Sequence, residues 1–229
     1  VNRVRILFAM SGWVDSSVVA ALLKEQGHEV IRVTMKLWEG PNGEMPESGC
    51  CTASDSEDAR RVASKLDIPY YVLDYTESFS KNVVDNFTQM YAQGLTPNPC
   101  VECNRSVKFD HFINQAKKLN CDKVATGHYA KIIKKNDKYE LHKADYLDKD
   151  QSYVLHMLQS SDLENITFPL GEISKPEVRQ IAARIGLRTA FKKDSQDICF
   201  VGKKDYRSFV EKRIDLTSPG EIFDTKGNK

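Results

Sequence analysis

The chain has 229 residues, of which 41% are hydrophobic and 28% are charged, a composition typical of a globular protein. It has no run of about 18 apolar residues, which argues against a transmembrane helix, and its N-terminus lacks the features of a signal peptide. We therefore expect a cytoplasmic protein with no membrane partner. The 33 Lys and Arg residues nearly balance the 32 Asp and Glu residues, so net charge neither indicates nor excludes a nucleic-acid partner.

Strands and helices are predicted to alternate along most of the chain. Runs of branched apolar residues predict buried strands, and apolar residues at helical spacing predict helices. The predicted strands cover residues 4–10, 29–37, 70–75 and 122–127, and the predicted helices cover residues 16–26, 55–66, 77–93, 105–119, 175–187 and 205–213. A β-hairpin is expected over residues 129–143 and a strand-like segment over residues 218–229. This order predicts an α/β fold with a doubly wound, mostly parallel sheet, whose ligands bind at the carboxyl ends of the strands.

Residues 11–17 join the first predicted strand to the first predicted helix, with the sequence Ser-Gly-Trp-Val-Asp-Ser-Ser. Small residues leave backbone N–H groups accessible, and the helix N-terminus favours an anion, so the loop could bind phosphate. An ordinary capped turn explains the same residues, because Asp and Ser are common N-caps. The loop resembles the PP-loop, SGGxDS, of ATP pyrophosphatases, which activate substrates as adenylates. Trp13 stands where that pattern has glycine, and we expect the indole to crowd the phosphates or distort the loop.

Residues 96–104 contain two prolines and the pair Cys100 and Cys103. Asn104 is a candidate N-cap for the following helix, which would place Cys103 near a helix N-terminus, where a thiol pKa is lowered and the nucleophilic thiolate is favoured. A second Cys pair that would complete a tetrahedral zinc site is missing. A redox dithiol is an alternative.

Residues 194–201 predict a strand-like segment that carries Cys199. Taken alone, this cysteine is interpreted as structural. Together with the phosphate-binding candidate and Cys103, it suggests sulfur chemistry on an adenylated substrate.

Five segments together resemble the bacterial and mitochondrial tRNA-specific 2-thiouridylases (MnmA type), in order and spacing and over nearly the whole chain. They are residues 11–17, 96–109, 125–131, 149–155, and 175–187 with 192–202. The resemblance implies an ATP-dependent sulfurtransferase that makes 2-thiouridine at the wobble position of certain tRNAs. It implies ATP and Mg²⁺ as cofactors. It also implies tRNA and a sulfur donor, either a cysteine desulfurase or a sulfur-relay protein, as partners.

The resemblance also implies roles for individual residues. The implied ATP site comprises Ala9, Met10, Ser11, Gly12, Trp13, Val14, Asp15, Ser16, Met35 and Gly127. The implied contacts with the target base are Asn98, Pro99 and Cys100, and those with tRNA are Lys149, Asp150 and Gln151. Cys103 matches the nucleophile and Cys199 the persulfide carrier. In an alternative within the family, Cys100, Cys103 and Cys199 hold a [4Fe–4S] cluster.

By the same resemblance, residues 1–203 form a PP-loop adenylation and sulfur-transfer domain. Residues 204–229 then begin a small central domain, and the family's C-terminal β-barrel is absent from this chain. Two functions of other classes stay open. One is a non-catalytic α/β fragment that binds tRNA or metal, and the other is a PP-loop ligase that acts on a small molecule.

Overall fold

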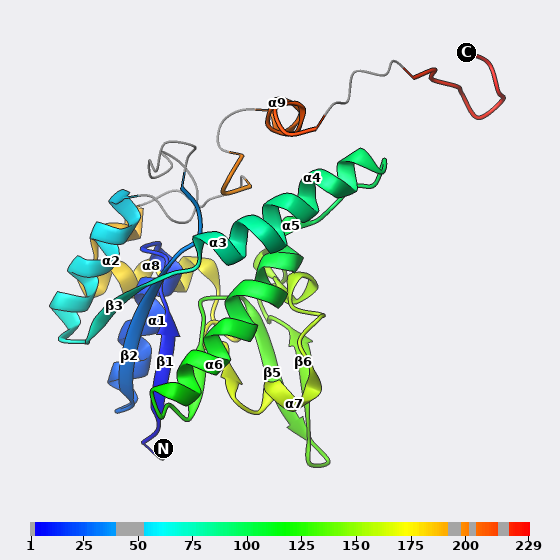
Figure 1. Ribbon diagram of the computed structural model, residues 1–229. Helices are drawn as coiled ribbons and strands as arrows, with labels where there is room; N and C mark the ends of the chain where they lie inside the picture. The colour runs from blue at the N-terminus through cyan, green and yellow to red at the C-terminus, as the bar shows by residue number, and fades with distance from the viewer. Residues whose placement is uncertain (1–2, 40–52, 192–197, 202–204, 215–219) are drawn as a thin grey trace.

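The computed structural model describes residues 3–39, 53–191, 198–201, 205–214 and 220–229 (Figure 1). Residues 194–197, the first part of the predicted strand-like segment that carries Cys199, lie outside the described residues.

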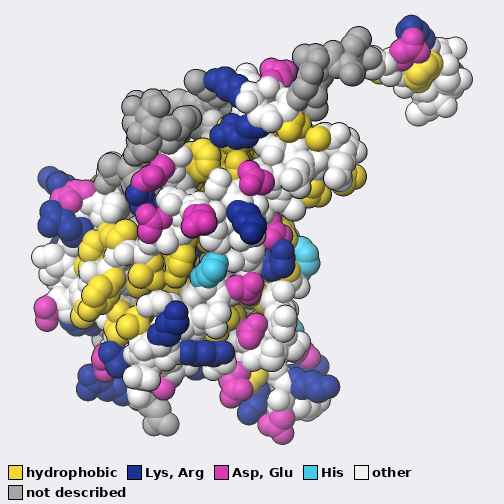
Figure 2. All heavy atoms as spheres, viewed as in Figure 1, with side chains coloured by type: hydrophobic (Ala, Val, Ile, Leu, Met, Phe, Trp, Pro, Cys, Tyr) yellow, Lys and Arg dark blue, Asp and Glu magenta, His cyan; other side chains and the backbone are white. Residues whose placement is uncertain are grey.

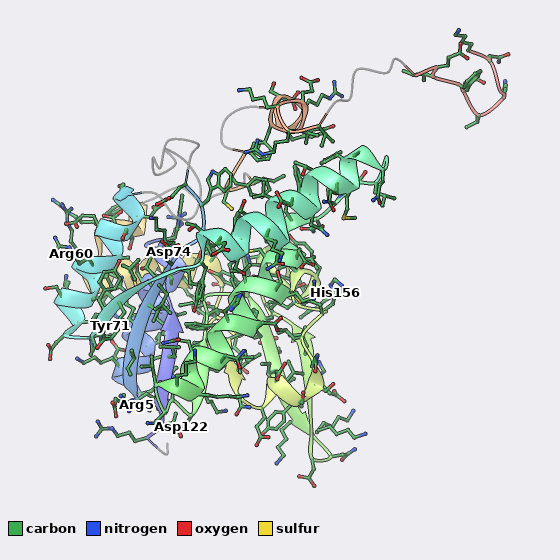
Figure 3. The ribbon with its side chains drawn as sticks, viewed as in Figure 1. Arg5, Arg60, Tyr71, Asp74, Asp122 and His156 are labelled. Atoms are coloured by element: carbon green, nitrogen blue, oxygen red, sulfur yellow. The ribbon has the colours of Figure 1, made fainter. Side chains whose placement is uncertain are left out.

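A five-stranded parallel sheet forms the centre of the molecule, with the order β3-β2-β1-β4-β7. Its strands are β1 (Arg5–Ala9), β2 (Glu29–Lys36), β3 (Tyr70–Asp74), β4 (Lys123–Ala125) and β7 (Ile166–Thr167). The predicted α/β class is confirmed, and the four predicted strands are present. Strand β7 was not predicted, because two residues are too few to show a period. At the amino edge of the sheet, the backbone N–H of Arg5 donates to Asp122, which precedes β4 (2.7 Å; Figure 3).

Helices cover both faces of the sheet (Figure 1). On one face, α1 (Val14–Glu25), α2 (Ala53–Leu66) and α8 (Lys175–Arg184) pack on Ile6 and Phe8. On the other face, two longer helical runs pack on Leu7. These runs are α3 (Thr76–Phe79), η1 (Ser80–Val84) and α4 (Asp85–Ala92), then α5 (Pro99–Glu102), η2 (Cys103–Phe109) and α6 (Asp110–Lys118). Successive side chains of β1 therefore point alternately into two apolar clusters, one on each face, as a doubly wound sheet requires.

The helical run that carries Cys103 begins earlier than predicted. Its N-cap is Asn98, whose side-chain oxygen accepts from the backbone N–H groups of Cys100 (3.1 Å) and Val101 (3.4 Å). Asn104 is buried instead, and its amide donates to the carbonyl of Val154 (3.1 Å). The prediction of Asn104 as N-cap is therefore wrong, and Cys103 lies one turn inside the helix, at the start of a π-helical segment.

The remaining elements are a β-hairpin and several short helices (Figure 1). The hairpin is β5 (Ala130–Lys135) and β6 (Lys138–Lys143), joined by a turn in which both central residues have positive φ. The short helices are η3 (Leu147–Lys149), η4 (Ser152–Val154), α7 (Ser160–Leu163), η5 (Arg188–Phe191) and α9 (Tyr206–Glu211). No described helix is long and apolar enough to cross a membrane.

The segment around Cys199 is a turn and not a strand. The N–H of Val201 donates to the carbonyl of Ile198 (3.1 Å), so the described part of the predicted strand, residues 198–201, is folded back on itself. Phe200 drives this shape, because its ring is buried in an aromatic cluster. The partners of Phe200 are Trp38, Phe79, Phe87 and Phe209, with ring centroids 5.2–6.2 Å away. The described residues 220–229 contain no strand either.

Strand β2 carries an unusual buried charge. Arg32 is 0% exposed, and none of its three side-chain nitrogen atoms has a hydrogen-bond partner among the described residues. Its guanidinium lies over the ring of Tyr70, 4.8 Å from the centroid. Burial lowers the pKa of Arg32 to about 10, so the group is still charged at neutral pH. The neighbouring edge strand β3 is partly open, with Tyr71 54% exposed, and Figure 2 shows hydrophobic side chains gathered over this region.

Candidate functional site

A cavity of about 420 Å³ opens at the carboxyl ends of β1, β2 and β4. Eight of the ten residues expected at an ATP site line it: Ala9, Met10, Ser11, Trp13, Asp15, Ser16, Met35 and Gly127. Lys149, Asp150 and Gln151, expected to contact tRNA, line it as well. Gly12 and Val14 are buried beneath the loop and do not line the cavity. Four separate stretches of the chain therefore converge on one space at the edge where doubly wound sheets bind ligands.

The loop between β1 and α1 is held by the hydroxyl of Ser16. This hydroxyl donates to the carbonyl of Trp13 (3.0 Å) and accepts from the N–H of Ser11 (3.3 Å). No described side chain caps the N-terminus of α1. The first-turn N–H groups therefore have no side-chain acceptor among the described residues, an arrangement that favours an anion.

Two glycines allow close approaches around this loop. Gly12 has φ +78°, and a Cβ there would lie 2.0 Å from the carbonyl oxygen of Asp55 at the start of α2. A Cβ on Gly127 would lie 3.3 Å from the backbone nitrogen of Ser16. The loop is thus wedged between α2 and the segment after β4, with no room for side chains at these two points.

Trp13 sits in ordinary extended backbone, with φ −93° and ψ 166°. Any residue adopts these angles, so the expected distortion of the loop by a residue larger than glycine is wrong. The indole lines the cavity. The indole therefore reduces the space available to a ligand. That it crowds the phosphates stays a prediction.

A cluster of three polar side chains lies beside the loop between β1 and α1: Asp15, Tyr129 and Lys175. The ammonium of Lys175 donates to both carboxylate oxygens of Asp15 (2.7 and 2.6 Å), and the hydroxyl of Tyr129 donates to one of them (2.7 Å). All three residues line the cavity. The sequence indicates Lys175 only as the first residue of a predicted helix, because a contact across 160 residues leaves no local signal.

The three cysteines with an implied role lie outside the cavity. Cys100 is exposed beside the Asn98 cap, Cys103 is 6% exposed, and Cys199 is half-buried in its turn. Cys103 belongs to the apolar cluster against which Cys199 packs. Within the described residues, no group of three or more His, Cys, Asp or Glu side chains is arranged to hold a metal ion. Cys100, Cys103 and Cys199 therefore do not fit an iron–sulfur cluster as they are placed here, and we derive no step through one.

Comparison with known proteins gives the family. Residues 4–203 match the family model described as the tRNA methyl transferase HUP domain. The tRNA-specific 2-thiouridylase MnmA of Chloroflexus aurantiacus is 49% identical over 228 residues, which cover 98% of this chain and 63% of the relative. The chain belongs to the tRNA-specific 2-thiouridylase family. The protein of the same name from Clostridioides difficile is 48% identical over 227 residues, again covering 98% of this chain and 63% of the relative.

Two solved structures share the fold of this thiouridylase-family chain. A 4-thiouridine synthetase in complex with RNA and bound ATP matches 91% of this chain and 50% of its own, with a TM-score of 0.56 and 14% identity. The U34-tRNA thiolase NcsA from Methanococcus maripaludis, with its [4Fe-4S] cluster, matches 93% of this chain and 65% of its own, with a TM-score of 0.54 and 19% identity. At these identities the likeness confirms the fold class alone.

His128 of this thiouridylase-family chain lines the cavity as a neutral group. Its Nδ1 lies 2.7 Å from the hydroxyl of Thr126, and its ring packs against the rings of Phe109 and Phe168, whose centroids are both 6.1 Å away. Burial, helped by the charge of Lys108, lowers the pKa of His128 to about 3. The imidazole can therefore orient a ligand by hydrogen bonding but brings no positive charge to the cavity at neutral pH.

The lowered pKa of His128 predicts a pH-dependent stability. The unfolded chain takes up a proton on this side chain near pH 6.5, whereas the folded chain does so only near pH 3. Stability is therefore fully present above about pH 6.5 and falls as the pH drops below it, by about 2 kcal/mol at pH 5. Urea unfolding at pH 7.5 and pH 5 measures this change. The His128→Gln variant should lose that part of the pH dependence.

An exposed histidine provides the control for this measurement. His156 points away from the body of the protein (Figure 3). The His156→Gln variant should keep the pH dependence of the unsubstituted chain. An equal slope in the His128→Gln and unsubstituted chains would show that His128 is protonated without cost in the folded state.

Proposed function

We propose that this chain carries the activation and sulfur-transfer steps of a tRNA 2-thiouridylase. The chain spans 63% of the length of the relatives it matches, so the complete activity is a proposal. The observation that carries it is the convergence of the expected ATP residues and the expected tRNA residues on one cavity. Such convergence suits a site where a nucleotide and a base must meet.

In the first step, ATP activates the wobble uridine. The carbonyl oxygen on carbon 2 attacks the α-phosphorus, pyrophosphate leaves, and the oxygen becomes part of an AMP leaving group. The first-turn N–H groups of α1 would receive phosphate oxygens. Asp15 and Asp148 line the cavity, and one or two carboxylates together with phosphates suffice to hold Mg²⁺, which would neutralise phosphate charge. Lys149 and Gln151 would position the RNA at the same opening.

In the second step, sulfur replaces the activated oxygen. Cys199 would carry a persulfide received from a cysteine desulfurase or a sulfur-relay protein. The thiolate of Cys103 attacks the sulfur of Cys199, the two residues form a disulfide, and hydrosulfide is released. Hydrosulfide adds to carbon 2, and AMP leaves with the oxygen. A thiol reductant then returns both cysteines to the reduced form. Cys103 and Cys199 both pack in the apolar cluster on one face of the sheet, which is compatible with this pairing.

Cysteine variants test the proposed function. The measurement is 2-thiouridine in tRNA, by nucleoside mass spectrometry, after incubation with ATP, Mg²⁺ and a persulfide donor. The Cys199→Ser and Cys103→Ser variants should form no 2-thiouridine and should still bind ATP. The Cys121→Ser variant is the matched control, because Cys121 precedes β4 at the amino edge of the sheet, opposite the carboxyl edge where the cavity opens, and burial raises its thiol pKa. Unchanged product from the Cys199→Ser variant would exclude this mechanism.

A second candidate function is RNA binding without catalysis, and the indole of Trp13 inside the cavity favours it. The two candidates differ in whether ATP binds. If the indole only takes up space, the Trp13→Gly variant should bind ATP about tenfold more tightly than the unsubstituted chain, measured by calorimetry with Mg²⁺. The Trp13→Ser variant should gain as much, since the backbone at this position does not require glycine.

The outcome separates the two functions. Measurable ATP binding by the unsubstituted chain supports an active enzyme. Binding only by the two variants would mean that the family site is intact but blocked by Trp13. If both variants bind ATP no more tightly than the unsubstituted chain, the indole does not obstruct the phosphates.

A further inference from the structure

We propose that Lys175 binds the pyrophosphate part of ATP, and that Asp15 holds its ammonium in place until the phosphates enter. The inference deepens the proposed function and rests on the ATP site described there. It concerns a residue outside the sites expected from the sequence.

The burial of this ion pair is the first argument. Lys175 is 7% exposed, and Asp15 lies in the first turn of α1. The Asp15 side chain is 25% exposed, so the ammonium loses nearly all of its water and the carboxylate only part of it. This desolvation is costly, and such a pair often contributes little net stability compared with apolar side chains of the same size. A lysine at this position, with its ammonium at the wall of a cavity, is therefore better explained by a role in ligand binding than by a contribution to folding stability.

The position of the pair relative to two helices is the second argument. Asp15 is the second residue of α1, and Lys175 is the first residue of α8, which packs against α1. Ser174 and Glu177 form a capping box that fixes the start of α8. The carboxylate thus lies in the first turn of α1, at the positive end of that helix dipole, and contacts the ammonium that the start of α8 supplies. Asp15 occupies the kind of position that a phosphate group would take.

Competition between carboxylate and phosphate follows from this geometry. Asp15 can turn toward a cation that accompanies ATP, and the ammonium of Lys175 is then available to phosphate oxygens. The hydroxyl of Tyr129 donates to the same carboxylate and so lies beside the loop as well. Among the described lysines that line the cavity, Lys108 and Lys149 come from η2 and η3, and Lys175 contacts Asp15 in the first turn of α1. Lys175 should therefore strengthen the binding of the pyrophosphate part of ATP and not that of the adenosine part.

Binding measurements with three ligands test this role. Calorimetry with ATP, inorganic pyrophosphate and AMP should show that the Lys175→Met variant binds ATP and pyrophosphate about 10- to 100-fold more weakly, as loss of a charged hydrogen bond predicts. AMP affinity should change less than about twofold. The Lys175→Arg variant should recover part of the loss. The Lys131→Met variant is the matched control, because Lys131 also pairs with an aspartate, Asp145, but lies on the hairpin.

A variant of Asp15 gives a readout that a purely structural role would not produce. The Asp15→Asn variant keeps the shape of the side chain and removes the charge that competes with phosphate. It should bind metal-free pyrophosphate at least about threefold more tightly, and added Mg²⁺ should no longer improve binding.

Two results would overturn the role of Lys175. Equal weakening of AMP and pyrophosphate by Lys175→Met would indicate a structural effect, and no weakening of either would remove the residue from the site. These results differ from failure of the proposed function itself. In that case neither the unsubstituted chain nor its Trp13→Gly variant would bind AMP or ATP, and the inference would fall with the site.

Discussion

The Gly12→Ala substitution is expected to lower the free energy of unfolding by about 3–5 kcal/mol, with a fall in Tm of about 6–15 °C. Two costs combine. The φ of +78° disfavours any side chain at this position. The new Cβ would also lie 2.0 Å from the backbone oxygen of Asp55, so the start of α2 must move. Because Gly12 lies in the loop that lines the cavity, ATP binding should be lost with the native loop geometry.

Gly94 separates these two costs. It has φ +74°, nearly the same as Gly12, but no atom lies within 4 Å of the position that a Cβ would take there. The Gly94→Ala variant should therefore lose only about 1 kcal/mol, the cost of the left-handed backbone. Thermal unfolding of both variants tests the argument. Similar losses would mean that α2 moves aside easily and that Gly12 is required only for its backbone conformation.

The sequence predicted the fold well where the structure is decided locally. The unit from β1 to β2 follows from a buried apolar run, an amphipathic helix and Gly27, and its observed bounds differ from the predicted ones by one or two residues. The start of the helix that carries Cys103 was predicted too late, because Asn98 and Asn104 are both residues of a type that favours the N-cap position. Pro99 at the first helical position decides between them.

The candidate site could be predicted only in part, for a physical reason. The loop around Asp15 and the segment at Gly127 carry local patterns at the ends of strands, and the sheet brings such ends together. The pairing of Asp15 with Lys175 depends on how α8 packs against α1, which no local pattern encodes. The turn at Cys199 likewise depends on Phe200, whose aromatic partners come from distant parts of the chain.

Replacing Arg32 with methionine is expected to raise the free energy of unfolding by about 2–4 kcal/mol. The guanidinium of Arg32 is fully buried, has no hydrogen-bond partner among the described residues, and keeps its charge at neutral pH, so its desolvation is not offset by hydrogen bonds from the described part of the chain. Methionine fills similar space without a charge. Tm should rise by about 5–15 °C, measured by calorimetry.

Two further variants show whether the charge is the cause. The Arg32→Lys variant keeps a buried charge and loses the stacking on Tyr70, so it should be no more stable than the unsubstituted chain. Arg60 on α2 pairs with Glu57 at the surface (Figure 3), and its replacement by methionine should leave Tm nearly unchanged. A less stable Arg32→Met variant would mean that stacking on Tyr70 outweighs desolvation, and that β2 depends on the guanidinium it buries.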